Sequence, residues 1–263
     1  MGKMLLEQIE ILYSIPLVLV SVYITLIFWM AAAIGKWIGN KRKSVKAPAD
    51  GSNFVPTTIL GLMALVLGFT FSMAVSRFDQ RKNALVQEAN AIGTAYLRAQ
   101  LLPPQFGNNL QSLLKEYVDV RISFHQTKAD RLKQNEVDER TSRLQDQIWK
   151  SLIPLTSQHK DPIVALTVAS VNDVFDRTSE RKSTSLNRIP ELVYFILISI
   201  GVFGVFSMGY VDGRSKNGTV FNIIVLSFLF SLVISLVLDI DRPQRGLIQN
   251  DQRPLLELKE SFR

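Results

Sequence analysis

The sequence predicts an all-α integral membrane protein with four transmembrane helices and a helical extramembrane domain inserted between the second and third. The 263 residues contain four apolar runs without charged residues, and a helix needs about 20 such residues to cross a bilayer. Apolar residues make up 47% of the chain, and the mean hydropathy of +0.16 suits a membrane bundle joined to a polar part. The residues between the second and third runs show almost no strand pattern.

The apolar runs are arranged as two hairpins. In chain order the predicted spans cover about 15–35, 54–76, 192–211 and 219–238. The first two form an N-terminal transmembrane hairpin, residues 1–76, and the last two form a C-terminal hairpin, residues 190–238. Pro56 and Pro190 lie near span starts, where a missing backbone N–H costs little. Residues 239–263 form a polar tail.

The inserted domain, residues 77–189, is predicted to contain only helices. Their expected ranges are 77–102, 110–124, 130–152 and about 162–185. Pro103 and Pro104 end the first helix, and Pro154 is expected to close the third. Asp161 is a predicted N-cap, with Pro162 at the first helical position.

Composition excludes several classes of function. The net charge of +7 is explained by basic residues flanking the spans, and no nucleic-acid-binding motif accompanies it. The chain has no cysteine, and His125 and His159 stand in unrelated contexts, so we expect no thiol chemistry, metal site or cofactor. The spans carry no ionisable groups of the kind that intramembrane catalysis uses, so we expect no enzyme.

Charge alone leaves the membrane orientation open. With four spans, the N-terminus, the inserted domain and the tail share one side. That side carries more Lys and Arg near the span ends, but the short loop 40–53 on the other side is more densely basic.

A possible pore constriction lies on the second span. Gly61, Leu65 and Phe69 are four residues apart, so they share one helix face. Repeated around a symmetry axis, this face would form a narrow apolar constriction that can gate by dewetting. The alternative is ordinary packing between helices, with Gly61 and Gly68 allowing close approach.

Basic residues follow this span at the membrane boundary. Arg77, Arg81 and Lys82 are candidates for a pore mouth or an interface, and the alternative is that their side chains reach toward the headgroups. Arg77 is also a candidate for a buried ion pair with Glu88 or with an acid near Asp239.

Two further polar groups have competing interpretations. Glu88 and Asn90 lie in a helix of small apolar residues, where they would form either a polar ring in an extramembrane pore or an interhelical hydrogen bond. The turn after the last span, residues 239–243, contains Asp239, Asp241, Arg242 and Pro243. The two acids would either help to hold a divalent cation or simply form the polar end of the helix. The positive charge of Arg242 argues against the cation site.

Several motifs resemble the bestrophin family, and more closely the bacterial proteins with a bestrophin-like domain. Leu67-Gly68-Phe69 is followed after seven residues by Arg77-Phe78, where bestrophins have Arg-Trp. The bacterial group typically continues with the sequence read at 88–99, Glu-Ala-Asn-Ala-Ile-Gly-Thr-Ala-Tyr-Leu-Arg-Ala, and 241–243 match its Asp-Arg-Pro. The chain departs from bestrophins at Gln244, where Phe would stand, in lacking a dense acidic run, and at Gly61, where a bulky residue is usual.

The resemblance implies a pentameric ion channel that conducts small inorganic ions passively. The second span would line the pore, and the inserted domain would lengthen it in the cytosol of a bacterium, with both termini on the same side of the inner membrane. The basic loop 41–46 would then be external and would gather anions at the pore mouth. The alternative function is a non-conducting membrane sensor or scaffold whose charged helix 130–152 docks a partner protein.

Overall fold

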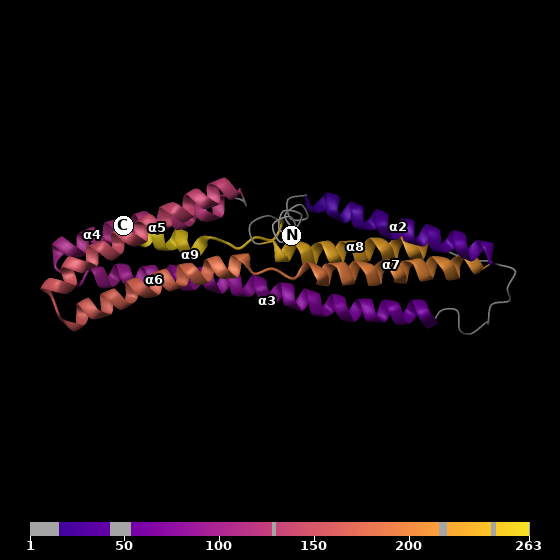
Figure 1. The fold of residues 1–263 in the computed structure, drawn as a ribbon, viewed down its shortest axis with the longest axis horizontal. Coiled ribbons are helices and arrows are strands. Elements are labelled where there is room, and N and C mark those ends of the chain that lie inside the picture. Colours follow the sequence, from indigo (N-terminus) through magenta and orange to yellow (C-terminus); the bar gives the residue numbers. More distant parts are fainter. Residues whose placement is uncertain (1–15, 43–53, 128–129, 216–219, 243–245, 263) are drawn as a thin grey trace, which may run out of the picture. The chain divides into compact units, whose positions relative to one another are not determined.

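The computed structural model describes residues 16–42, 54–127, 130–215, 220–242 and 246–262, and within these ranges it contains helices and no strands (Figure 1). Four of the helices are long and apolar enough to cross a membrane, and they are α2 (Leu17–Lys41), α3 (Phe54–Ala99), α7 (Glu191–Arg214) and α8 (Val220–Asp241). The predicted all-α fold with four spans is therefore confirmed. Pro243 and most of the basic loop 41–46 lie outside the described residues.

The chain divides into two compact units. The first, here called the span unit, comprises Met1–Ser76 and Arg188–Arg242, and the second, the inserted unit, comprises Arg77–Asn187 and Pro243–Arg263. Helix α3 contributes residues to both units. Of the polar tail, residues 239–242 group with the span unit and the later residues with the inserted unit.

In the span unit, α2 and α7 run parallel in close contact. A Cβ atom on Gly35 would overlap the backbone carbonyl of Phe206, and one on Gly209 would overlap the carbonyl of Ala32. Gly39 and Gly213 face the opposite backbone in the same way one turn later. Small residues at this spacing let membrane helices approach closely enough for backbone packing, which lipid cannot replace. The spacing Gly35-x-x-x-Gly39 therefore serves contact between α2 and α7.

The inserted unit is built from the second half of α3 together with α4 (Pro104–Gln126), α5 (Arg131–Gln158), α6 (Pro162–Leu186) and α9 (Arg253–Ser261). Its apolar core includes Ile92 and Leu114, neither of which is exposed. The tail helix α9 packs on this core through Leu255, which is also fully buried. Phe262 stacks on Tyr96 with ring centroids 4.0 Å apart, which holds the end of the chain on α3.

The start of α6 agrees with the prediction from the sequence, and the end of α5 differs from it. The Asp161 carboxylate accepts a hydrogen bond from the Val164 amide (3.0 Å), and Pro162 occupies the first turn of α6, as predicted. The expected end of the third inserted helix at Pro154 is wrong, because α5 continues to Gln158. Proline removes one backbone hydrogen bond, and with a single further turn to follow, α5 tolerates that loss.

Candidate functional site

Helix α3 has one buried face and one exposed face within the span unit. Met63, Leu67, Thr70 and Ala74 are buried and recur every three or four residues. Met63 lies against α7, because a Cβ on Gly201 would meet its terminal methyl group at 3.2 Å. This packing determines which side of α3 turns away from the rest of the unit.

The predicted constriction residues lie on the exposed face of α3. Gly61 is exposed with open space around it, and Leu65 and Phe69 are 57% and 67% exposed. Gly68, also exposed, would meet nothing within 4 Å if it carried a Cβ. No residue of the described chain therefore packs closely over this face at either glycine.

Hydroxyl groups flank the apolar part of this face. Thr58 precedes Gly61 and its hydroxyl donates to the Phe54 carbonyl (2.9 Å), while Ser72 and Ser76 follow Phe69, and all three side chains are exposed. Between Thr58 and Ser72 the face is thus apolar, and a hydroxyl group stands at each end of this apolar segment.

The basic residues after the span are split between two faces. Arg81 is buried at 4% exposure, whereas Lys82 is exposed. Arg77 donates to the side-chain carbonyl of Asn187 inside the inserted unit. The expected Arg77–Glu88 ion pair is wrong, because eleven residues separate the two along one helix, a rise of about 16 Å.

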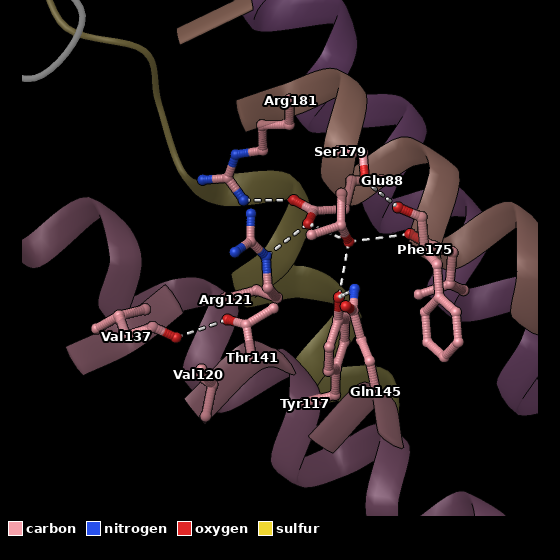
Figure 2. Close-up of polar contacts among 12 residues, drawn as sticks. Glu88, Tyr117, Val120, Arg121, Val137, Thr141, Gln145, Phe175, Ser179 and Arg181 are labelled. Carbon is pink, nitrogen blue, oxygen red and sulfur yellow. Dashed lines mark hydrogen bonds and ion pairs between the residues drawn. The ribbon is translucent and has the colours of Figure 1, made fainter. Parts of the chain in front are cut away.

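Glu88 lies inside the inserted unit and is not exposed at all. Its carboxylate accepts from Arg121 of α4 (2.6 Å) and Arg181 of α6 (2.5 Å) (Figure 2). It also accepts from the Thr178 hydroxyl of α6 (3.0 Å), so α4 and α6 both meet α3 at this carboxylate. Tyr117 extends the network, since its hydroxyl lies 2.8 Å from that of Thr178.

The electrostatics of this network favour the ionised carboxylate. Burial alone raises the pKa of Glu88, but the charges of Arg121 and Arg181 and their hydrogen bonds outweigh it, so the pKa falls below its ordinary value. Burial is the largest influence on Tyr117, whose pKa is raised. Arg181 also donates to the Gln252 side chain (3.1 Å), which connects the network to the segment just before α9.

Glu88 and Asn90 do not form one site. Asn90 is exposed, whereas Glu88 is enclosed by side chains of its own chain. The expectation that Glu88 belongs to a polar pore ring is therefore wrong for this conformation, and the alternative of an interhelical contact describes it. Asn90 lies on the same side of α3 as Leu65 and Phe69, as judged by helical spacing.

The turn after the last span connects α8 to the start of α7. Asp241 is fully buried, and it accepts from the Ile189 amide (3.1 Å) and the Tyr194 hydroxyl (3.4 Å). Asp239 and Arg242 are also buried, at 2% and 5% exposure. Among the described residues no group of three or more His, Asp and Glu side chains is placed to hold a metal ion.

Comparison of the sequence with known protein families identifies the family of this chain. A model of the bestrophin-like domain matches residues 26–255. The chain belongs to the bestrophin-like domain family. The resemblance carried by Leu67-Gly68-Phe69 and by residues 88–99 is thereby confirmed. Comparison with the curated proteins found no significant match.

Solved structures show the same fold. A crystal structure of a bacterial bestrophin homologue from Klebsiella pneumoniae carrying one substitution has a TM-score of 0.68 at 15% identity, covering 94% of this chain and 97% of that one. A structure of the homologue from the same organism, solved by zinc phasing, has a TM-score of 0.62 at 16% identity, covering 93% and 99%. At this level of identity the likeness concerns the fold.

Three features of the bestrophin-like chain were not predicted from the sequence. Arg121 follows Leu114, Tyr117 and Val118 at helical spacing, so a cation on an apolar helix face was the available signal of a buried partner. Nothing local in the sequence around Arg181 shows that it meets Glu88, which lies 93 residues away along the chain. The polar continuation of the exposed α3 face was likewise missed, although its period is visible between Ser72 and Thr94.

Proposed function

We propose that this bestrophin-like protein is an oligomeric ion channel that conducts small inorganic ions passively through a pore lined by α3. Gly61, Leu65 and Phe69 would form its constriction, and Arg77 and Lys82 would lie near its mouth or at the membrane interface. A pentamer is the favoured assembly, as the resemblance to bestrophins implies, and membership of the bestrophin-like domain family supports that choice.

The exposed face of α3 carries the proposal. Helices α2, α7 and α8 also expose large apolar side chains, and lipid can cover these. The exposed face of α3 differs because its apolar part, Leu65 and Phe69, is bordered by Thr58 on one side and Ser72 on the other. A water-filled path with a narrow apolar segment accounts for this pattern, whereas contact with lipid alone does not require hydroxyl groups on both sides of the apolar residues.

The proposal includes the orientation in the membrane. The protein would lie in the bacterial inner membrane with its N-terminus, inserted unit and C-terminus in the cytosol. The basic loop 41–46 would then face outward.

Currents across planar bilayers test the proposal. Purified full-length protein should conduct, and Phe69→Ala should increase conductance or open probability because it widens the constriction and makes it easier to wet. Phe203→Ala is the matched control, because Phe203 on α7 is 66% exposed, against 67% for Phe69. The control should leave the currents unchanged.

Two results would overturn the proposal. One is the absence of current with several anions and cations, together with a monomeric mass in detergent by light scattering. The other is an equal effect of Phe69→Ala and Phe203→Ala, which would remove α3 from the conduction path. Absence of current would favour the alternative, a membrane sensor or scaffold that docks a partner through α5.

A further inference from the structure

The exposed face of α3 continues well beyond the proposed constriction. We call it the α3 stripe, and it consists of residues at helical spacing that are all exposed: Phe54, Thr58, Gly61, Leu65, Phe69, Ser72, Ser76, Asp79, Asn83, Gln87, Asn90, Thr94 and Leu97. The residues on the opposite face, including Met63, Ala74, Arg81 and Glu88, are buried. Other exposed residues of α3, among them Val55, Leu62 and Lys82, lie to either side, so the α3 stripe is the middle of a wider exposed face.

Asp79 is the only ionisable side chain on the α3 stripe. The polar residues on either side of it are serine, threonine, asparagine and glutamine. Asp79 comes five turns of about 3.6 residues after Gly61, so it has the same angular position on the helix. It lies roughly 15 Å beyond Phe69 along the helix axis.

Nearby basic groups do not neutralise Asp79. Among the described residues no ion pair joins it to a cation. Lys82 is exposed three residues later but lies toward the edge of the stripe. Arg177 of α6 reaches Gln87 (2.5 Å) and is itself paired with Asp173 (3.2 Å) and Glu180 (2.9 Å).

We infer that Asp79 determines the charge preference of the channel, so that cations pass in preference to anions. The inference rests on the proposed function, in which every copy of the chain presents its α3 stripe to one path. Each copy then contributes one carboxylate, and together these carboxylates form an acidic ring. Acidic rings attract cations in other channels, and low-dielectric walls focus their field.

The overall charge of the chain does not decide the preference. The net charge of +7 would by itself favour anions. Ions respond mainly to charges within a Debye length, about 8 Å at physiological ionic strength, so charges elsewhere on the chain matter little. Lys82 lies within that distance of Asp79, but a separation of three residues turns it about 60° round the helix, away from the middle of the α3 stripe. On the α3 stripe itself the charge is negative.

Reversal potentials in a tenfold KCl gradient test the inference. The full-length wild type should prefer K⁺ over Cl⁻. The neutral variant Asp79→Asn should lower the cation-to-anion permeability ratio about threefold or more, and Asp79→Lys should reverse the preference. Both effects should grow at lower ionic strength, because screening weakens.

Glu139→Gln is the matched control. Glu139 is an exposed acid on α5, so its loss changes the charge of the same unit without touching the α3 stripe. It should leave the permeability ratio unchanged. Because Asp79 is exposed, its variants should elute from size exclusion in detergent as the wild type does.

The outcomes separate this inference from the proposed function. Currents with an unaltered permeability ratio in both Asp79 variants would overturn the inference and leave the channel standing. A wild type that prefers Cl⁻ would also overturn it. Absence of current from the wild type would overturn the channel, and the role of Asp79 with it.

Discussion

Replacing Glu88 with glutamine removes one charge from the centre of the inserted unit and keeps the size of the side chain. Two guanidinium groups, those of Arg121 and Arg181, then lose their shared carboxylate. Their side chains are 2% and 8% exposed, so water cannot replace the lost partner. The variant therefore leaves two uncompensated cations in the core.

The expected loss of stability is large. Breaking a buried ion pair by removing one partner costs about 3–5 kcal/mol. For a unit of this size that corresponds to a decrease in Tm of roughly 10–20 °C. Glu180→Gln provides the comparison, because Glu180 pairs with Arg177 at the surface, where solvent screening leaves an ion pair little effect on stability.

Tryptophan fluorescence during heating measures this difference in the full-length protein. Trp149 belongs to the inserted unit, with its ring 6.4 Å from that of Phe175, so unfolding should change its emission. Replacing Trp29 and Trp37 with phenylalanine leaves Trp149 as the only tryptophan. A Tm for Glu88→Gln equal to that of Glu180→Gln would refute the reasoning.

The pH dependence provides a second test on the same proteins. The folded-state pKa of Glu88 is below its ordinary value of 4.5, because Arg121 and Arg181 outweigh the effect of burial. A depressed carboxyl pKa stabilises the folded state above the unfolded value, and that stabilisation is lost as the pH falls through the folded value. The Tm gap between wild type and Glu88→Gln should be constant from neutral pH to about 4.5 and narrow below it. A gap that persists unchanged in strong acid would contradict this assignment.

Two further predictions concern packing, and a third concerns a buried hydrogen bond. Gly209→Ala should lower the Tm of the span unit by several degrees, because its Cβ would overlap the Ala32 backbone, whereas Gly68→Ala, with nothing within 4 Å, should lower it little or not at all. Leu255→Ala should cost about 2–5 kcal/mol and expose the α9 segment to limited proteolysis, because this fully buried residue fixes the tail helix. Asp241→Asn should also lower the Tm of the span unit, by losing a charge-assisted bond to the Ile189 amide, and an unchanged Tm would contradict that role.

The spans and the inserted helices could be predicted because their signals are local. An apolar run such as 219–238 can be recognised as a span from its own residues, since crossing the bilayer depends on the composition of one segment. Asp161 and Pro162 similarly mark a helix start through neighbouring atoms. The predicted helix end at Pro154 was wrong because the effect of a proline depends on how much helix follows it.

The contacts of Glu88 could not be predicted in this way. Arg121 and Arg181 lie 33 and 93 residues further along the chain, and only the packing of three helices brings them to one carboxylate. The same packing buries Glu88 and leaves Asn90 exposed, although the two are neighbours in sequence.

The sequence by itself determined the membrane architecture, the helical insertion and the bestrophin-like family, because hydropathy and short motifs are properties of continuous segments. Only the tertiary structure decided which face of α3 is covered. Met63 packs against Gly201 inside the span unit, so Leu65 and Phe69 lie on the opposite, exposed side of α3. Asp79 follows on that exposed side by helical spacing. Periodicity shows which residues share a face, but the orientation of that face depends on what packs against the other side.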